Sequence, residues 1–260
     1  MKRVTLVTFA WALTLLLAGG RVSAQDASPA DPNKSNAQAM AVAKRVVDFL
    51  SQAERFSVTV DIGFDAVQDD GQKIEFGETR KILLDRPDHL RVEDTKRNGS
   101  TSELVFDGKT IMIYYAKDNV YAVADRPGTL DDAVSYYVND LGMRLPLSQL
   151  IDRQMAANLP SQIRSAAYVE QSSIAGVPCD QIALRGEDAD LQLWVAQGAQ
   201  PLLQRVVITY KRLDGRPQFW AQFSDWNLKP KVSDKLFSVT PPKGAVKIAF
   251  AAQQMLQPGK

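Results

Sequence analysis

The spacing of apolar residues changes along the chain, and each spacing predicts a different kind of element. Between Met40 and Leu50 apolar residues recur every three or four positions, which predicts one amphipathic helix with Ser35 or Asn36 as its cap. From Phe56 to Phe64 apolar residues occupy every second position, which is typical of a half-buried strand. The folded part of the chain is therefore expected to open with a helix and to continue as a sheet.

Ten further runs of strand-forming residues follow, separated by turn-forming pairs such as Asp70-Gly71 and Asp107-Gly108. The runs cover residues 74–84, 90–94, 102–106, 110–115, 120–124, 165–174, 178–185, 190–196, 203–211 and 218–228. Residues 130–141 and 147–159 lack this alternation and predict two helices. In the second of them one helical face carries Leu147, Leu150, Ile151 and Met155.

This order predicts a mainly β (α+β) domain, a curled antiparallel half-barrel of about eleven strands. Twist accumulates from strand to strand, so an open sheet of this size curls, and its apolar inner face must be covered. The N-terminal helix and the interposed helices are the expected cover. A sheet curled around helices encloses either a filled core or an apolar cavity, and the pattern alone leaves both open.

The first 24 residues have the three parts of a secretory signal peptide, with Lys2 and Arg3 before an apolar run and Val22-Ser23-Ala24 at the expected cleavage site. The apolar run is too short to span a membrane, and no cysteine near the site could carry a lipid anchor. We therefore expect a soluble periplasmic protein. Its expected parts are a signal peptide (1–24), a disordered leader (25–35), one folded domain (36–250) and a flexible tail (251–260).

Charge and cysteine content exclude several classes of function. Removing residues 1–24 takes three of the 31 basic residues and none of the 30 acidic ones, which leaves 28 against 30. Without a basic excess, nucleic acid is not an expected partner. Cys179 is the only cysteine, so an internal disulfide is impossible. A nucleophilic role for Cys179 would need His89, the only histidine, as its base, and nothing in the sequence brings the two together.

Several stretches resemble the periplasmic lipoprotein chaperone LolA and its relatives. They are Phe56, Arg86-Pro87, the hairpin Leu104-Val105-Phe106-Asp107-Gly108-Lys109-Thr110-Ile111-Met112-Ile113-Tyr114-Tyr115, and Phe237-Ser238-Val239-Thr240-Pro241-Pro242-Lys243-Gly244. The sequence is closer still to a group of predicted periplasmic proteins of unknown function that share this fold. The resemblance implies a carrier of a lipid, acyl chain or other apolar ligand under a helical lid, with a possible part in lipoprotein or outer-membrane lipid trafficking.

By this resemblance Arg86 is the lid latch, since an arginine before a proline helps to hold the lid of LolA shut. Apolar residues at inward positions are the candidate cavity lining. They are Val58, Val60, Ile62, Phe64, Ile82, Leu84, Leu90, Val92, Leu150, Ile151 and Met155. The alternative that remains open is an envelope protein-protein interaction module with a filled core, and the oligomeric state is not predicted.

Enzymatic function is not expected, because none of the usual hydrolase, redox or phosphate-loop motifs occurs. A hydrolase built from two carboxylates remains a third hypothesis. No cofactor and no metal are expected, given one histidine and one cysteine. In the last long strand Trp220 and Trp226 share one face, and Phe219 and Phe223 share the other. We expect one face to pack under the helices, and the other suits a protein partner or the packing of the leader or tail.

Overall fold

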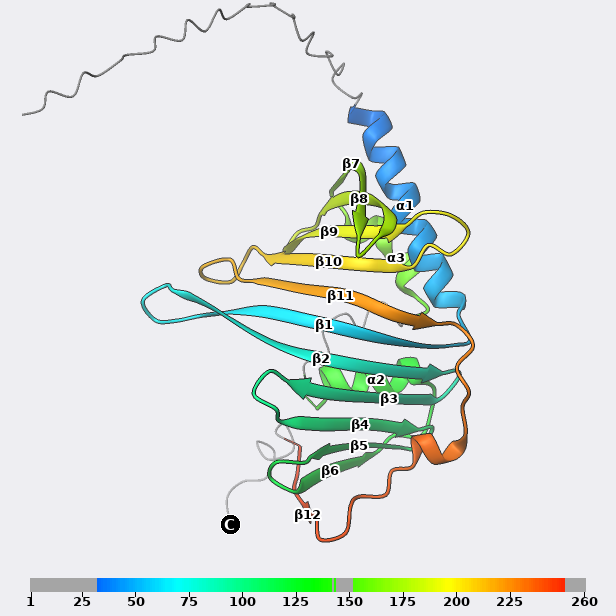
Figure 1. Ribbon diagram of the computed structural model, residues 1–260, viewed down its shortest axis with the longest axis vertical. Helices are drawn as coiled ribbons and strands as arrows, with labels where there is room; N and C mark the ends of the chain where they lie inside the picture. The colour runs from blue at the N-terminus through cyan, green and yellow to red at the C-terminus, as the bar shows by residue number, and fades with distance from the viewer. Residues whose placement is uncertain (1–31, 142, 144–151, 251–260) are drawn as a thin grey trace, which may run out of the picture. The chain divides into compact units, whose positions relative to one another are not determined.

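The computed structural model describes residues 32–141, 143 and 152–250, and its strands form a single twelve-stranded sheet (Figure 1). The order across the sheet is β12-β6-β5-β4-β3-β2-β1-β11-β10-β9-β8-β7. The strands are β1 (Arg55–Val67), β2 (Lys73–Asp85), β3 (His89–Lys96), β4 (Thr101–Asp107), β5 (Thr110–Tyr115), β6 (Val120–Asp125), β7 (Ser165–Ile174), β8 (Val177–Arg185), β9 (Ala189–Ala196), β10 (Leu203–Tyr210), β11 (Gln218–Asn227) and β12 (Val246–Lys247).

The predicted fold class is confirmed, since the sheet is mainly antiparallel, curled and not closed into a barrel. All eleven predicted strands are present. The sequence missed β12, whose two residues pair in parallel with Val120 and Tyr121 of β6, because a pair of residues shows no alternation.

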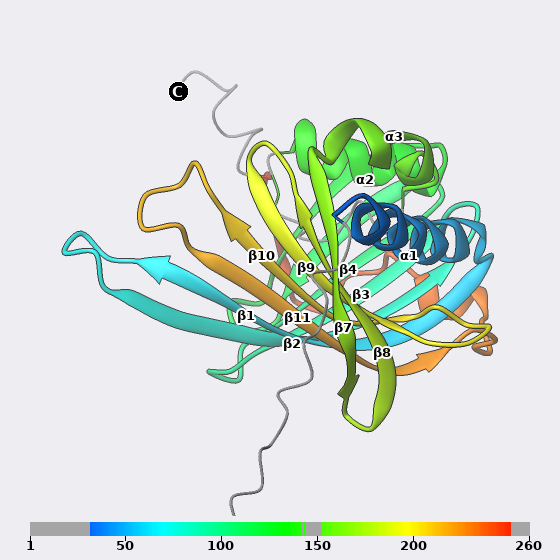
Figure 2. The same ribbon diagram turned by 90° about the horizontal axis from the view of Figure 1, so that it is seen from above.

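Among the described residues, three helices lie on the concave side of the sheet (Figure 2). They are α1 (Pro32–Gln52), α2 (Leu130–Asn139) and α3 (Met155–Gln162). Helix α1 begins at Pro32 and not near Asn36, so neither Ser35 nor Asn36 is its cap. Proline suits the first turn of a helix because its missing N–H would have no partner there. The hydroxyl of Ser35 instead accepts a hydrogen bond from the backbone N–H of Tyr168 on the edge strand β7 (3.0 Å).

Helix α2 begins at a capping box. The Thr129 hydroxyl accepts a hydrogen bond from the Asp132 N–H, and the Asp132 carboxylate accepts one from the Thr129 N–H. These contacts lower the pKa of Asp132 through its hydrogen bonds to Thr129. The capping carboxylate is therefore charged at neutral pH, and it suits the positive end of the helix dipole.

The main apolar core fills the space between the helices and the concave face of the sheet. A smaller cluster on the convex face joins Val105 and Met112 to Phe237, which lies in a short 3-10 helix at Asp234–Phe237. The chain after β11 thus covers part of the convex face. The predicted signal peptide, the leader up to residue 31, the tail 251–260, and Leu147, Leu150 and Ile151 lie outside the described residues.

One prediction about β11 is wrong: Trp220 and Trp226 do not share a face. Asp225 has a positive φ of 53°, and the pairing of β1 with β11 shifts its register between Ser57 and Thr59. Such a bulge interrupts the alternation of side chains. Trp226 therefore packs against Phe56 and Phe223 and partly lines the core, whereas Trp220 lies on the opposite face.

Candidate functional site

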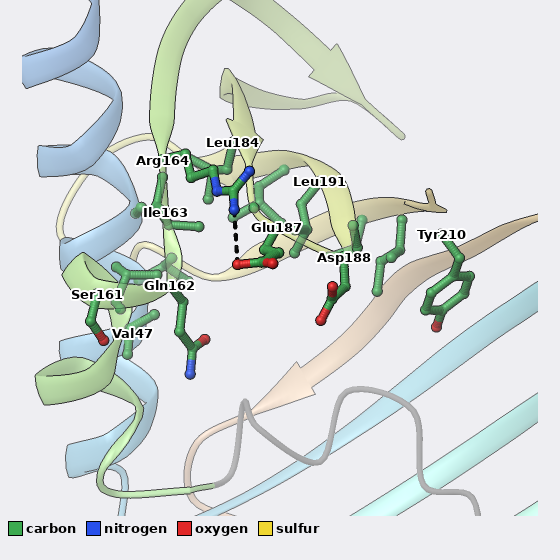
Figure 3. Close-up of a pocket in the computed structure, with 18 of the residues that line it drawn as sticks. Val47, Ser161, Gln162, Ile163, Arg164, Leu184, Glu187, Asp188, Leu191 and Tyr210 are labelled. Atoms are coloured by element: carbon green, nitrogen blue, oxygen red, sulfur yellow. Dashed lines mark ion pairs between the residues drawn. The ribbon is translucent and has the colours of Figure 1, made fainter. Parts of the chain in front are cut away.

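A cavity of about 680 Å³ lies between helices α1 and α3 and the concave face of strands β8, β9 and β10 (Figure 3). Its walls are mainly aliphatic. The apolar wall residues are Val46, Val47, Leu159, Ile163, Leu184, Leu191, Leu193, Leu203, Val206 and Ile208. The volume lies within the range of ~300–1,000 Å³ that is usual for pockets that bind small molecules.

The strand part of the wall follows from the pairing register. Leu191 lies directly opposite Ile208, and Leu193 lies directly opposite Val206, so these four side chains point to the same face. Leu184 on β8 lies opposite Leu191 and extends the same row. Alternation therefore marks these residues as inward. It does not mark the place where the helices leave space above them.

Charged residues of the β8–β9 turn lie at one edge of the cavity. Glu187 forms ion pairs with Arg164 (2.8 Å) and with Arg212, and Asp188 pairs with Arg212 Nε (2.6 Å). The dashed line in Figure 3 marks the Arg164–Glu187 pair. All four side chains are well exposed, so each pair contributes little to stability, on the order of 0–1 kcal/mol.

The strand residues predicted to line a cavity lie elsewhere on the concave face. Buried in the apolar core are Val58, Val60, Ile62, Leu84, Leu90 and Val92. Ile82 packs partly buried against them. Phe64 is 39% exposed, because the hairpin of β1 and β2 projects beyond the neighbouring strands (Figure 1). None of these eight residues contributes to the wall of the cavity described above.

The other three residues that were predicted to line a cavity belong to the helix predicted at 147–159. Leu150 and Ile151 lie outside the described residues, and Met155 is the first residue of α3. The sequence reasoning missed the contribution of α1 to the cavity wall. Val46 and Val47 could have indicated this contribution, because they lie on the apolar face of the predicted helix.

Arg86 is buried where three elements meet. Its Nε donates a hydrogen bond to the carbonyl of Ala53, just beyond the end of α1 (3.2 Å), and its Nη1 lies 3.6 Å from Asp131 Oδ1 in the first turn of α2. Burial lowers the pKa of Arg86, and the charge of Asp131 opposes that shift. The adjacent Pro87 carbonyl accepts a hydrogen bond from Leu130 N (2.9 Å). Arg86 thus connects the end of α1 to the start of α2.

The structure does not bring Cys179 and His89 together. Cys179 lies on β8 and His89 on β3, with five strands between them. Cys179 is fully buried, and burial raises the pKa of its thiol, which disfavours the reactive thiolate. His89 pairs with Asp88 and packs against Phe237.

The described part of the chain contains neither a candidate metal site nor a helix that could cross a membrane. No group of three or more His, Cys, Asp or Glu side chains there lies close enough to hold a metal ion. Within residues 32–141 and 152–250, no helix combines the length and the apolar character needed to cross a bilayer.

Comparison with known proteins places the sequence among predicted periplasmic proteins. The profile of a family described as "Predicted periplasmic protein (DUF2092)" matches residues 39–251, which confirms the expected kinship with such proteins. No curated protein matches the chain.

Solved structures that are similar to the chain include the following three. One is an uncharacterized conserved protein from Thermus thermophilus (11% identity, TM-score 0.47, 80% of this chain and 98% of that one). The second is the Mycobacterium tuberculosis lipoprotein LppX (14% identity, TM-score 0.44, 74% and 97%). The third is a LolA superfamily protein from Nitrosomonas europaea (15% identity, TM-score 0.34, 77% and 97%). Because these TM-scores are below 0.5, no function is transferred from these proteins.

Substitution of leucine by tryptophan at two inward positions tests whether the cavity provides free space. Leu191→Trp should change the free energy of unfolding by less than about 1 kcal/mol, because the indole can enter the cavity. Leu84→Trp should cost about 1–3 kcal/mol or more, because Leu84 is fully buried in filled core. Urea denaturation measures both, with Leu213→Trp as an exposed control. Equal costs at positions 191 and 84 would contradict the assignment of free space.

Proposed function

The chain belongs to the DUF2092 family of predicted periplasmic proteins, and we propose that it is a carrier or binding protein for a lipid, acyl chain or other apolar ligand. The observation that carries this proposal is the cavity of about 680 Å³ with aliphatic walls between α1, α3 and strands β8–β10. Affinity comes from burial of the ligand, at ~0.8 kcal/mol for each methylene group that leaves water.

The proposal extends to the export of the protein and to its functional class. Residues 1–24 act as a cleaved signal peptide, and the mature protein is soluble in the periplasm, where it can take part in lipoprotein or outer-membrane lipid trafficking. It is a binding protein and not an enzyme. The separation of Cys179 from His89 supports this part, because it removes the cysteine-histidine pair that the sequence left open.

The proposal also gives Arg86 the role of a latch. Arg86 bonds the carbonyl of Ala53 beyond α1 and pairs with Asp131 at the start of α2. An arginine can hold several carbonyl and carboxylate oxygens at once, and a change of helix position would break these bonds together. Arg86 therefore stabilises the arrangement of helices that the structure shows, and ligand binding works against it.

Binding of a fluorescent fatty-acid analogue to the mature protein tests the carrier function. The wild-type protein should bind the probe, and Leu191→Trp should weaken binding at least about tenfold, because the indole occupies space that the acyl chain needs. Leu213→Trp makes the same substitution at an exposed position outside the cavity and should bind as the wild type does. A wild-type protein that does not bind the probe would contradict the proposal.

Arg86→Leu tests the latch. The variant should release bound probe about tenfold more slowly, because loss of a charge-assisted bond shifts the population towards the arrangement that holds ligand. Asp131→Asn removes the partner of the pair and should act in the same direction. Arg55→Leu breaks the more exposed Arg55–Asp85 pair and serves as the control. If Arg86→Leu releases the bound probe at the wild-type rate, Arg86 is not a latch.

A second candidate function is interaction with an envelope protein, and the projecting β1–β2 hairpin favours it. Phe64 and Phe76 lie directly opposite each other with stacked rings, and Ile74 shares their face. All three side chains are at least 39% exposed, which is unusual for large apolar residues so close together.

Photocrosslinking in cells distinguishes this second function. A photoreactive residue at position 76 should form one discrete adduct with an envelope protein if the hairpin is an interaction surface. A photoreactive residue at Lys81, exposed on the opposite face of the same strand, is the control. No adduct at position 76, or equal adducts at both positions, would reject the interaction.

A further inference from the structure

A straight row of polar and aromatic residues crosses the convex face of the sheet, opposite the side that holds the cavity. Its members lie directly opposite one another on successive strands, from β8 through β9, β10, β11 and β1 to β2 (Figure 1). They are Gln181, Trp194, Arg205, Gln222, Asp61 and Thr79. We call these six residues the convex row. All six are exposed or half-buried, and no aliphatic side chain interrupts the row.

Alternation along the strands places the convex row away from the core. Val206 follows Arg205 on β10, and Ile62 follows Asp61 on β1, and both of these aliphatic neighbours are buried in the core on the concave side. Adjacent side chains on a strand point to opposite faces, so Arg205 and Asp61 point outward. Each of the six strands is paired on both sides, so the row contains no free backbone edge.

Arg205 lies in the middle of the row and contacts an indole ring from each neighbouring strand. Its guanidinium carbon is 5.9 Å from the centre of the Trp194 ring on β9 and 5.1 Å from that of the Trp220 ring on β11. Its Nη1 donates a hydrogen bond to Gln222 Oε1 (3.3 Å). Among the described residues Arg205 forms no ion pair, and Asp61, the carboxylate of the row, lies two strands away.

Two glycines make room for planar side chains beside the row. Gly63 on β1 lies directly opposite Gly77 on β2 and Trp220 on β11. A Cβ at Gly63 would lie 2.4 Å from the Trp220 ring, and one at Gly77 would lie 2.6 Å from Arg97 Nε. Glycine weakens the interior of a strand, and it often marks a place where another group approaches closely. Here the two glycines let the indole and the guanidinium lie against the sheet.

The carboxylate beside this cluster is already occupied. Glu75 accepts a hydrogen bond from Trp220 Nε1 (3.1 Å) and pairs with Arg97 (2.9 Å). These bonds from Trp220 and Arg97 lower the pKa of Glu75, burial opposes the shift, and the charges of Arg97 and Arg205 lower the pKa further. Two guanidinium groups thus share one carboxylate around Trp220. The charge of Arg205 is therefore available to an anionic ligand.

The chemistry of the convex row matches a sugar that carries a carboxylate. The C–H groups of a pyranose ring pack on the electron-rich face of an indole, and its hydroxyls both donate and accept hydrogen bonds. The amides of Gln181 and Gln222 also donate and accept, and Asp61 accepts from a hydroxyl. The planar fork of Arg205 can hold both oxygens of a carboxylate.

The spacing of the row matches a linear polymer of such sugars. Neighbouring strands lie about 4.8 Å apart, which is close to the length of one sugar residue in a linear glycan. The six strands therefore present one side chain to each successive sugar. An acidic peptide fits less well, because an extended peptide gains its affinity by adding to a free strand edge, and these strands offer none.

We propose that the convex row binds a linear glycan that carries carboxylate groups. The glycan lies across the strands, with one carboxylate on Arg205 and sugar rings against Trp194 and Trp220. The row is on the face of the sheet opposite the cavity, so the inference goes beyond the proposed carrier function and does not depend on it.

Titration of the mature protein with hexagalacturonate, a linear acidic hexasaccharide, tests the inference. Calorimetry measures the affinity, and tryptophan fluorescence should change on binding because Trp194 and Trp220 lie at the site. The methyl ester of the same hexasaccharide keeps the rings and most hydroxyls but not the charges, and should bind at least about tenfold more weakly. Arg205→Gln should weaken binding of hexagalacturonate by a similar factor, and Trp194→Ala should also weaken it.

Arg91→Gln is the matched control, because Arg91 lies on the same face of β3 but pairs with Glu93 and Glu103. It should bind hexagalacturonate as the wild type does. Hexaglutamate represents an acidic peptide and should bind at least about tenfold more weakly than hexagalacturonate. No binding of hexagalacturonate, equal affinity for acid and ester, or equal or tighter binding of hexaglutamate would overturn the inference. The carrier function would stand in each case, because the fatty-acid analogue tests it separately.

Discussion

The structure depends on one constraint: a wide sheet with a single apolar face must curl and must be covered. Strand twist accumulates across the twelve strands, so the apolar face becomes concave. Helices α1, α2 and α3 all lie on that side (Figure 2). These three helices of the described residues, with 21, 10 and 8 residues, do not fill the concave space evenly. Packing is close under α2, where a space of only about 10 Å³ remains, and loose under α1 and α3.

This uneven cover divides the concave face into two differently packed parts. Strands β8–β10 face a cavity with aliphatic walls, and the central strands carry filled core. Arg86 lies where α1 ends and α2 begins, so it joins the helix over the cavity to the helix over the filled core.

Much of the fold could be predicted because the physical signals are local. Alternation and turn residues identified eleven strands, and the periodicity of residues 40–50 identified α1. The position of the cavity could not be predicted, since alternation shows which side chains point inward but not where a helix leaves space. The bulge that turns Trp226 inward has no sequence signal, because Asp225 is not a glycine.

The central claim is that the cavity holds an apolar ligand, and native mass spectrometry of the protein purified from periplasm tests it most directly. We expect a stoichiometric adduct that organic extraction releases and lipid analysis identifies as an acyl-chain compound. A mass equal to that of the bare mature chain, unchanged after lipid is added, would contradict it.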